Sequence, residues 1–233
     1  MRCRYPTHRG FQIITPQTNL HTCPSGQRVS FARARRQVRR PGGGVVPDFL
    51  MLVNADHPLP LDWKPDGLVD LWTQQPRHFL LPMRREYLVG AAFEAANAMF
   101  AEAEQAGLDD FEVRSAYRDA ERQAGIYERS RKDGYVARPG ESEHQTGLAF
   151  DVGSWYGPFL SDENAAHRDW IAEHCWEHGF IVRYPEGKED VTGVPAEPWH
   201  LRYVGRDVAL QIRDRGWALE EWHSQHLSAM SSA

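Results

Sequence analysis

The chain has 233 residues, of which 41% are hydrophobic and 25% charged, and this composition is typical of one globular domain rather than of a disordered or membrane protein. It contains no apolar run of about 18 residues, so no transmembrane helix is predicted. The net charge of −5 is unevenly distributed: residues 1–50 hold nine arginines and a single acid, whereas the rest of the chain is acidic. Blocks of this kind indicate a tail that is distinct from the folded body.

Residues 1–46 are therefore predicted to be a flexible, arginine-rich leader, and residues 47–233 a single domain. The arginines precede Pro41 and three glycines, which favour an irregular backbone. The leader is interpreted as a solvated tail or as a stretch upstream of a start at Met51. Nucleic-acid binding is the less favoured alternative, and it would appear as salt-sensitive binding that is lost when residues 1–46 are deleted. Polar residues and Pro16 interrupt residues 11–20, so no signal peptide is predicted.

The first half of the predicted domain mixes short strands with helices. Residues 49–53 are predicted to form a short apolar strand, and a proline-rich loop follows at residues 57–65. Apolar residues and alanines recur at helical spacing over residues 85–108, where Gly107 ends the helix. Residues 111–116 alternate as in a strand, residues 119–132 return to helical spacing, and residues 148–152 form a second strand.

The second half repeats this mixture. Ser161 is predicted to cap a helix that ends at Gly179. Residues 180–184 and 199–204 are predicted strands, and residues 206–214 form a helix that ends at Gly216. This order of elements predicts an α+β fold, in which helices pack on a small, mostly antiparallel sheet.

Two segments hold residues suited to metal chemistry. His144 lies just before a predicted strand, Asp151 lies within it, and Gly147 allows the backbone to turn between them. His200 begins a neighbouring strand. Two imidazoles and one carboxylate can bind zinc and leave one position for water. Glu197, in the loop before His200, is predicted to accept a proton from that water.

The full motifs resemble those of the VanY-type D-alanyl-D-alanine carboxypeptidases, within a wider group of zinc peptidases that includes VanX dipeptidases and related endolysins. The pattern Ser-x-His-x-x-Gly-x-Ala-x-Asp is met by Ser142, His144, Gly147, Ala149 and Asp151. The pattern Glu-x-x-His is met by Glu197 and His200. The resemblance covers roughly residues 50–205.

The resemblance implies that His144, Asp151 and His200 bind one Zn²⁺ ion per chain and that Glu197 is the catalytic base. It also implies a catalytic role for Arg118, near the scissile carbonyl or the terminal carboxylate of the substrate, because a guanidinium can form two hydrogen bonds with a carboxylate. The expected substrate-binding residues are Ser142, Gln123, Tyr117 and Trp199. Members of the group often have glycine at the position of Ala116 and tyrosine at that of Ala196, and the second difference affects the expected leaving-group preference.

The expected function is zinc-dependent D,D-carboxypeptidase activity on peptidoglycan stem peptides. The alternatives are a D,D-dipeptidase, an L,D-carboxypeptidase or endolysin-type peptidase, and a non-catalytic module that binds peptidoglycan peptides. A monomer without a nucleic-acid partner is expected. The function implies the cell envelope or the extracellular space, although a cytoplasmic location stays open because no signal peptide is visible.

One rival motif lies within the predicted helix that ends at Gly179. His174, Glu177 and His178 match the inverted zincin pattern His-x-x-Glu-His. That pattern requires a further acidic ligand well downstream, and the same helix carries Trp170 and Trp176, which are typical of packing positions. We therefore interpret it as a chance match.

Overall fold

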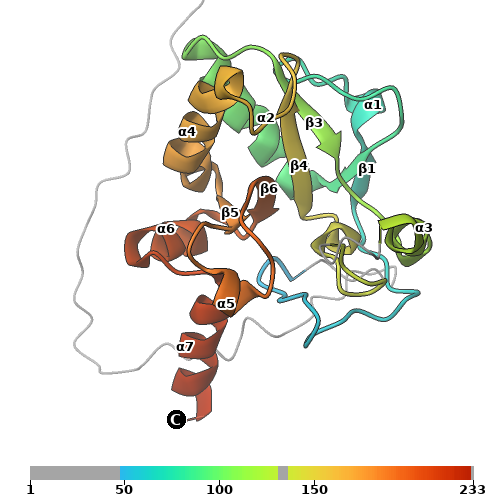
Figure 1. The fold of residues 1–233 in the computed structure, drawn as a ribbon, viewed down its shortest axis with the longest axis vertical. Coiled ribbons are helices and arrows are strands. Elements are labelled where there is room, and N and C mark those ends of the chain that lie inside the picture. The colour runs from blue at the N-terminus through green and yellow to red at the C-terminus, as the bar shows by residue number, and fades with distance from the viewer. Residues whose placement is uncertain (1–47, 131–135, 232–233) are drawn as a thin grey trace, which may run out of the picture. The chain divides into compact units, whose positions relative to one another are not determined.

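A computed structural model describes residues 48–130 and 136–231 of the chain. The predicted leader, residues 1–46, lies outside the described residues. Four strands form one antiparallel sheet in the order β3 (Phe111–Ser115), β4 (Ala149–Ser154), β6 (Glu197–Tyr203) and β5 (Phe180–Tyr184) (Figure 1). A separate antiparallel pair joins β1 (Leu68–Asp70) to β2 (Tyr87–Val89). The predicted α+β class and the small antiparallel sheet are confirmed.

The helices lie in the connections between these strands, except for α6 and α7, which follow β6. They are α1 (Leu71–Gln74), α2 (Gly90–Gln105), α3 (Ala120–Ser130), α4 (Ala165–His174), α5 (Glu189–Thr192), α6 (Arg206–Arg215) and α7 (Leu219–Ser231). Short 3-10 helices are η2 (Glu143–Thr146), η3 (Asp162–Asn164) and η4 (Cys175–His178). No helix in the described part of the chain is long and apolar enough to cross a bilayer.

The two faces of the four-stranded sheet differ in polarity, and this difference positions the site. Phe111, Phe150 and Leu201 lie on the apolar face and pack with Phe100 of α2 and Ile171 of α4 in the main core. Because alternate side chains of a strand point to opposite faces, the residues between them lie on the other face. These residues include Asp151 on β4 and His200 and Arg202 on β6.

Most predicted elements are present, with shifted ends. The helix expected over residues 85–108 begins only at Gly90, because residues 87–89 pair with β1 as strand β2. The helix expected to begin at Ser161 is divided into η3, α4 and η4, and it ends at Gly179, whose positive φ of 83° suits glycine. Strand β6 begins at Glu197, so this residue lies in the strand and not in the preceding loop.

The strand predicted over residues 49–53 is wrong. The backbone there forms a turn and irregular structure, and the carbonyl oxygens of Phe49 and Met51 accept hydrogen bonds of 3.1 and 2.7 Å from Nη2 of Arg202. Leu50 and Leu52 pack against a second apolar cluster that includes residues of α6 and α7. A buried side chain thus satisfies the backbone groups that a strand would have used.

Candidate active site

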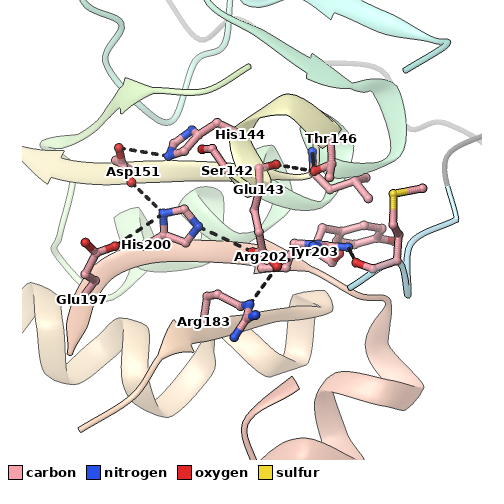
Figure 2. A network of polar contacts seen from close by, with 12 residues as sticks. Ser142, Glu143, His144, Thr146, Asp151, Arg183, Glu197, His200, Arg202 and Tyr203 are labelled. Carbon is pink, nitrogen blue, oxygen red and sulfur yellow. Dashed lines mark hydrogen bonds and ion pairs between the residues drawn. The ribbon is translucent and has the colours of Figure 1, made fainter. Parts of the chain in front are cut away.

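His144, Asp151 and His200 converge on the polar face of the sheet, although 56 positions separate the first from the last (Figure 2). Asp151 and His200 are direct partners across β4 and β6, which brings their side chains side by side. His144 comes from η2, immediately before β4. One ligand atom of each residue lies within 4.8 Å of the others, so the three groups could hold a single metal ion.

The hydrogen bonds of the two imidazoles leave suitable nitrogens for such an ion. Nδ1 of His144 donates to the carbonyl of Ala116 at 2.7 Å, so Nε2 carries the lone pair in the neutral ring and faces Oδ2 of Asp151 at 3.3 Å. His200 turns Nδ1 toward Oδ1 of the same aspartate at 3.0 Å. Imidazole nitrogen and carboxylate oxygen are ordinary zinc ligands, and three protein ligands leave a coordination position open. The residues therefore fit a catalytic zinc ion.

Gly147 allows the chain to turn between η2 and β4, as the sequence indicated. Its φ is +66°, and a Cβ atom at this position would lie 2.8 Å from Cδ2 of Leu68. Its amide donates to the carbonyl of His144. The tight turn therefore fixes the segment that carries this histidine.

The charges around the site favour a cation. Burial raises the pKa of Asp151, but the adjacent His144 and His200 outweigh that effect and hold the pKa well below its usual range. Burial lowers the pKa of His200, whereas its hydrogen bond to Asp151 and the nearby carboxylate of Glu143 raise it to about 9. The carboxylates thus stabilise positive charge at this position.

Glu197 lies beside the cluster without belonging to it. Its Oε2 is 3.9 Å from Nδ1 of His200, the nitrogen that faces Asp151. Burial raises the pKa of Glu197, and the nearby Asp151 raises it further, while His200 and Arg118 act in the opposite direction. A carboxylate with a raised pKa next to a metal-ligand set is suited to proton transfer.

Arg118 is fixed next to His144 by its backbone and its side chain. Its amide donates to the carbonyl of His144 at 3.1 Å. Its guanidinium donates to Gln123 at 3.0 Å, and more weakly to Ser115 at 3.2 Å and Ser142 at 3.5 Å. Gln123 is held in turn by its bond to the carbonyl of Ala137. Gln123 and Ser142, expected to contact substrate, thus also orient the arginine.

The two remaining predicted substrate residues lie differently. The hydroxyl group of Tyr117 is buried and has no hydrogen-bond partner among the described residues. Trp199 packs against the main core, and it also borders a groove of about 390 Å³ that Asp151, Arg114 and Phe159 line as well. Trp199 therefore lies at a groove next to Asp151, whereas the Tyr117 hydroxyl has no assigned contact among the described residues.

Sequence reasoning missed three buried charged residues behind the cluster: Glu143, Arg183 and Arg202. All three are fully or almost fully buried, and both arginines donate to Oε1 of Glu143 at 2.8 Å. Two features of the sequence could have indicated that Glu143 and Arg202 belong to the site. Glu143 lies between the motif residues Ser142 and His144, and Arg202 is two positions from His200, which places it on the same strand face.

The rival His-x-x-Glu-His motif is occupied by other contacts. Nδ1 of His174 lies 3.2 Å from Glu177, and its ring stacks on Trp170. His178 contacts Glu102 at 3.0 Å. Among the described residues, the group that could hold a metal is the one formed by His144, Asp151 and His200.

Comparisons with known proteins agree with this geometry. A family model, VanY, described as D-alanyl-D-alanine carboxypeptidase, matches residues 85–206. The chain is 38% identical over 186 residues to YodJ of Bacillus subtilis (strain 168), a protein named as a carboxypeptidase, and the match covers 75% of this chain and 67% of that one. It is 34% identical over 189 residues to the bifunctional D-Ala-D-Ala dipeptidase and carboxypeptidase VanXYC of Enterococcus gallinarum, with 75% and 93% of the two chains covered.

Solved structures give the same result. The LdcB LD-carboxypeptidase superposes with a TM-score of 0.68 at 34% identity, over 76% of this chain and 86% of that one. A vancomycin-resistance D,D-pentapeptidase VanY, solved with Zn(II), superposes with a TM-score of 0.61 at 31% identity, over 74% and 97%. The fold, the site and the relatives together define a carboxypeptidase, a hydrolase that acts at the C-terminal end of a peptide. The chain belongs to the VanY family of D-alanyl-D-alanine carboxypeptidases.

Proposed function

We propose that the chain is a zinc-dependent D,D-carboxypeptidase, which hydrolyses the amide bond of the terminal D-Ala in peptidoglycan stem peptides. The observation that carries the proposal is the convergence of two imidazoles and one carboxylate within 4.8 Å. The donor set favours zinc, and a related VanY was solved with that ion. One ion per chain is proposed, bound by His144, Asp151 and His200.

Glu197 is proposed as the general base and acid. When bound in such a site, zinc polarises the scissile carbonyl and lowers the pKa of water to about 7. Glu197 then takes a proton from the attacking water and transfers it to the amine of the leaving D-Ala as the C–N bond breaks. Its position 3.9 Å from His200 and its raised pKa support both steps.

Arg118 is proposed to bind the terminal carboxylate of the peptide. A carboxypeptidase must recognise this group, and a guanidinium can donate two parallel hydrogen bonds to it. Ser142 and Gln123 hold Arg118 in place. Tyr117, whose buried hydroxyl has no partner among the described residues, is proposed to donate to the substrate once the substrate is bound. Trp199 is proposed to contact the peptide where it borders the groove next to Asp151.

The domain division and the location form part of the proposal. We assign residues 47–233 to the peptidase domain, and residues 1–46 to a separate leader that the hydrolysis does not require. Peptidoglycan is a component of the cell envelope, so the proposed substrate implies that the enzyme acts in the envelope or outside the cell.

The test is to incubate the zinc-loaded protein with the dipeptide D-Ala-D-Ala, with a tetrapeptide that ends in L-Lys-D-Ala and with a pentapeptide that ends in D-Ala-D-Ala. The expected result is release of one D-Ala, fastest from the pentapeptide, and no release after the metal is removed by chelation. Faster release from the tetrapeptide would assign the L,D activity of the similar LdcB, and cleavage of the dipeptide alone would assign a dipeptidase. No release from any peptide, or undiminished release after chelation, would contradict the proposal.

A further inference from the structure

Two buried polar atoms behind the proposed metal site face each other without forming a hydrogen bond. Nε2 of His200 and Oε2 of Glu143 each lack a hydrogen-bond partner among the described residues, and they lie 3.7 Å apart. Leaving a buried donor or acceptor unpaired costs free energy, so such atoms need an explanation. A shift of the imidazole by less than 1 Å would close the gap to a normal hydrogen bond.

Glu143 itself is held in place from the opposite side. Its other oxygen, Oε1, accepts hydrogen bonds of 2.8 Å from Nε of Arg183 and from Nη1 of Arg202 (Figure 2). The carboxylate is therefore paired with two buried guanidinium groups through one oxygen, and its other oxygen is directed toward His200.

Both histidine-bearing segments contribute to this arrangement. Glu143 is the chain neighbour of His144, and Arg202 lies two residues after His200 on the same face of β6. Arg202 also donates to the carbonyls of Phe49 and Met51. The position of Oε2 thus depends on η2, on β6 and on residues 49–51. A carboxylate held in this way has far less freedom to move than one on the protein surface.

We propose that Glu143 is a positioning residue of the metal site: its Oε2 accepts the Nε2 proton of His200, which leaves the lone pair of Nδ1 directed toward the metal. The inference rests on the proposed function, because it concerns the ligand set assigned there. Glu143 faces the ring nitrogen remote from Asp151, so it is not itself a ligand in this geometry. A carboxylate that holds the outer nitrogen of a ligating histidine fixes the ring and raises its basicity.

The test is Glu143→Gln. The arginines would bind the amide oxygen of the new side chain, so its NH₂ group would face Nε2 of His200 and favour the tautomer with the proton on Nδ1. Zinc affinity, measured by competition with a chelator, is expected to fall about 10- to 100-fold. In the zinc-loaded wild-type protein, ¹⁵N NMR of the histidine rings is expected to show a slowly exchanging Nε2 proton on His200, which the variant lacks.

Glu220→Gln is the matched control. Glu220 accepts hydrogen bonds from Nη1 and Nη2 of Arg183, on the side of the guanidinium away from Glu143, and its further hydrogen bond within the described part of the chain is with Asn54 rather than His200. It is expected to lower stability while zinc affinity and the His200 proton signal stay as in the wild type. A purely structural role for Glu143 predicts instead that both variants change zinc affinity equally, and that outcome would overturn the inference.

A second variant covers the case in which Glu143→Gln does not fold. Glu143→Asp keeps the charge that the arginines require but withdraws the carboxylate by one methylene, so weaker zinc binding by a folded protein is expected. Wild-type affinity in this variant would also overturn the inference. If the wild-type protein binds no zinc, the proposed function fails. If the wild-type protein binds zinc and the Glu143 variants bind it equally tightly, the inference about Glu143 fails and the proposed function stands.

Discussion

His144 and His200 face the two oxygens of one aspartate and are buried to a similar depth, but different groups lie behind them. Behind His144 is a backbone carbonyl, that of Ala116, at 2.7 Å. Behind His200 is the side chain of Glu143, which two buried arginines hold. A backbone carbonyl is present whatever residue occupies the position, whereas a carboxylate can be removed by one substitution. The His200 side is therefore the part of the site that mutation can adjust.

The largest expected effect concerns Glu197, which approaches the site on the His200 side. Glu197→Gln keeps the size of the side chain but cannot accept a proton. We expect kcat to fall by about 10²- to 10⁴-fold, the usual contribution of a general acid–base group, while zinc content stays the same. Steady-state kinetics on a pentapeptide, with metal analysis of the same sample, measures both. A variant with near-normal kcat would remove Glu197 from the mechanism.

The buried charges behind His200 should matter more to stability than the partly exposed charge behind His144. In Arg202→Met, Glu143 keeps only one of its two arginines, and the carbonyls of Phe49 and Met51 lose their donor. We expect a loss of about 3–5 kcal/mol in the free energy of unfolding. The control is Arg84→Met. Arg84 pairs with Glu86 on the His144 side but is half exposed, so a loss of about 1 kcal/mol or less is expected. Urea unfolding compares them, and equal losses would contradict the difference between the two sides.

The same network should make stability depend on pH. Because the pKa of Glu143 is lower in the folded protein than in the unfolded chain, its contribution is complete above the unfolded value, about 4.3, and is lost as pH falls through the folded value. The wild-type protein should therefore lose more stability between pH 6 and pH 3 than Glu143→Gln does. Urea midpoints of both proteins without metal would test this. Parallel pH profiles would mean that Glu143 is not linked to acid unfolding.

The smallest effect on zinc affinity is expected behind His144. Glu86 is buried, and its Oε2 accepts the amide proton of Ala116 at 2.7 Å, so it steadies the peptide whose carbonyl holds His144. Glu86→Gln should cost about 1–3 kcal/mol of stability. Its effect on zinc affinity should be smaller than that of Glu143→Gln, because the carbonyl of Ala116 remains. A larger loss of affinity in Glu86→Gln would reverse the proposed order of the two sides.

Periodicity predicted the sheet well because its strands have one apolar face. Phe111, Phe150 and Leu201 alternate with polar residues, and this alternation identifies a strand without any tertiary information. The strand prediction for residues 49–53 was wrong because a contact distant in the sequence determines their backbone. Their apolar pattern is that of a strand, but their carbonyls bind Arg202, which is about 150 positions away in the sequence.

The candidate site was predictable where chemistry and spacing agree. His144, Asp151 and His200 were named from residue type and motif, and the structure brings them together. Glu143 and its arginines were not, because charged residues are ordinarily exposed and no local pattern shows that three of them are buried together. Only the folded structure, in which η2 lies against β5 and β6, shows that the charge of Glu143 is compensated by the two arginines.

The contact of Arg202 with residues 49 and 51 also sets the boundary of a useful recombinant fragment. A fragment that begins at residue 48 keeps both carbonyl acceptors and the edge-to-face contact of Phe49 with Tyr203. One trimmed to residue 54, a natural choice if the domain were taken to begin after the irregular segment, would leave Nη2 of a buried guanidinium without those acceptors. A fragment that keeps these contacts therefore begins about 20 residues ahead of β1, in a segment with no helix or strand of its own.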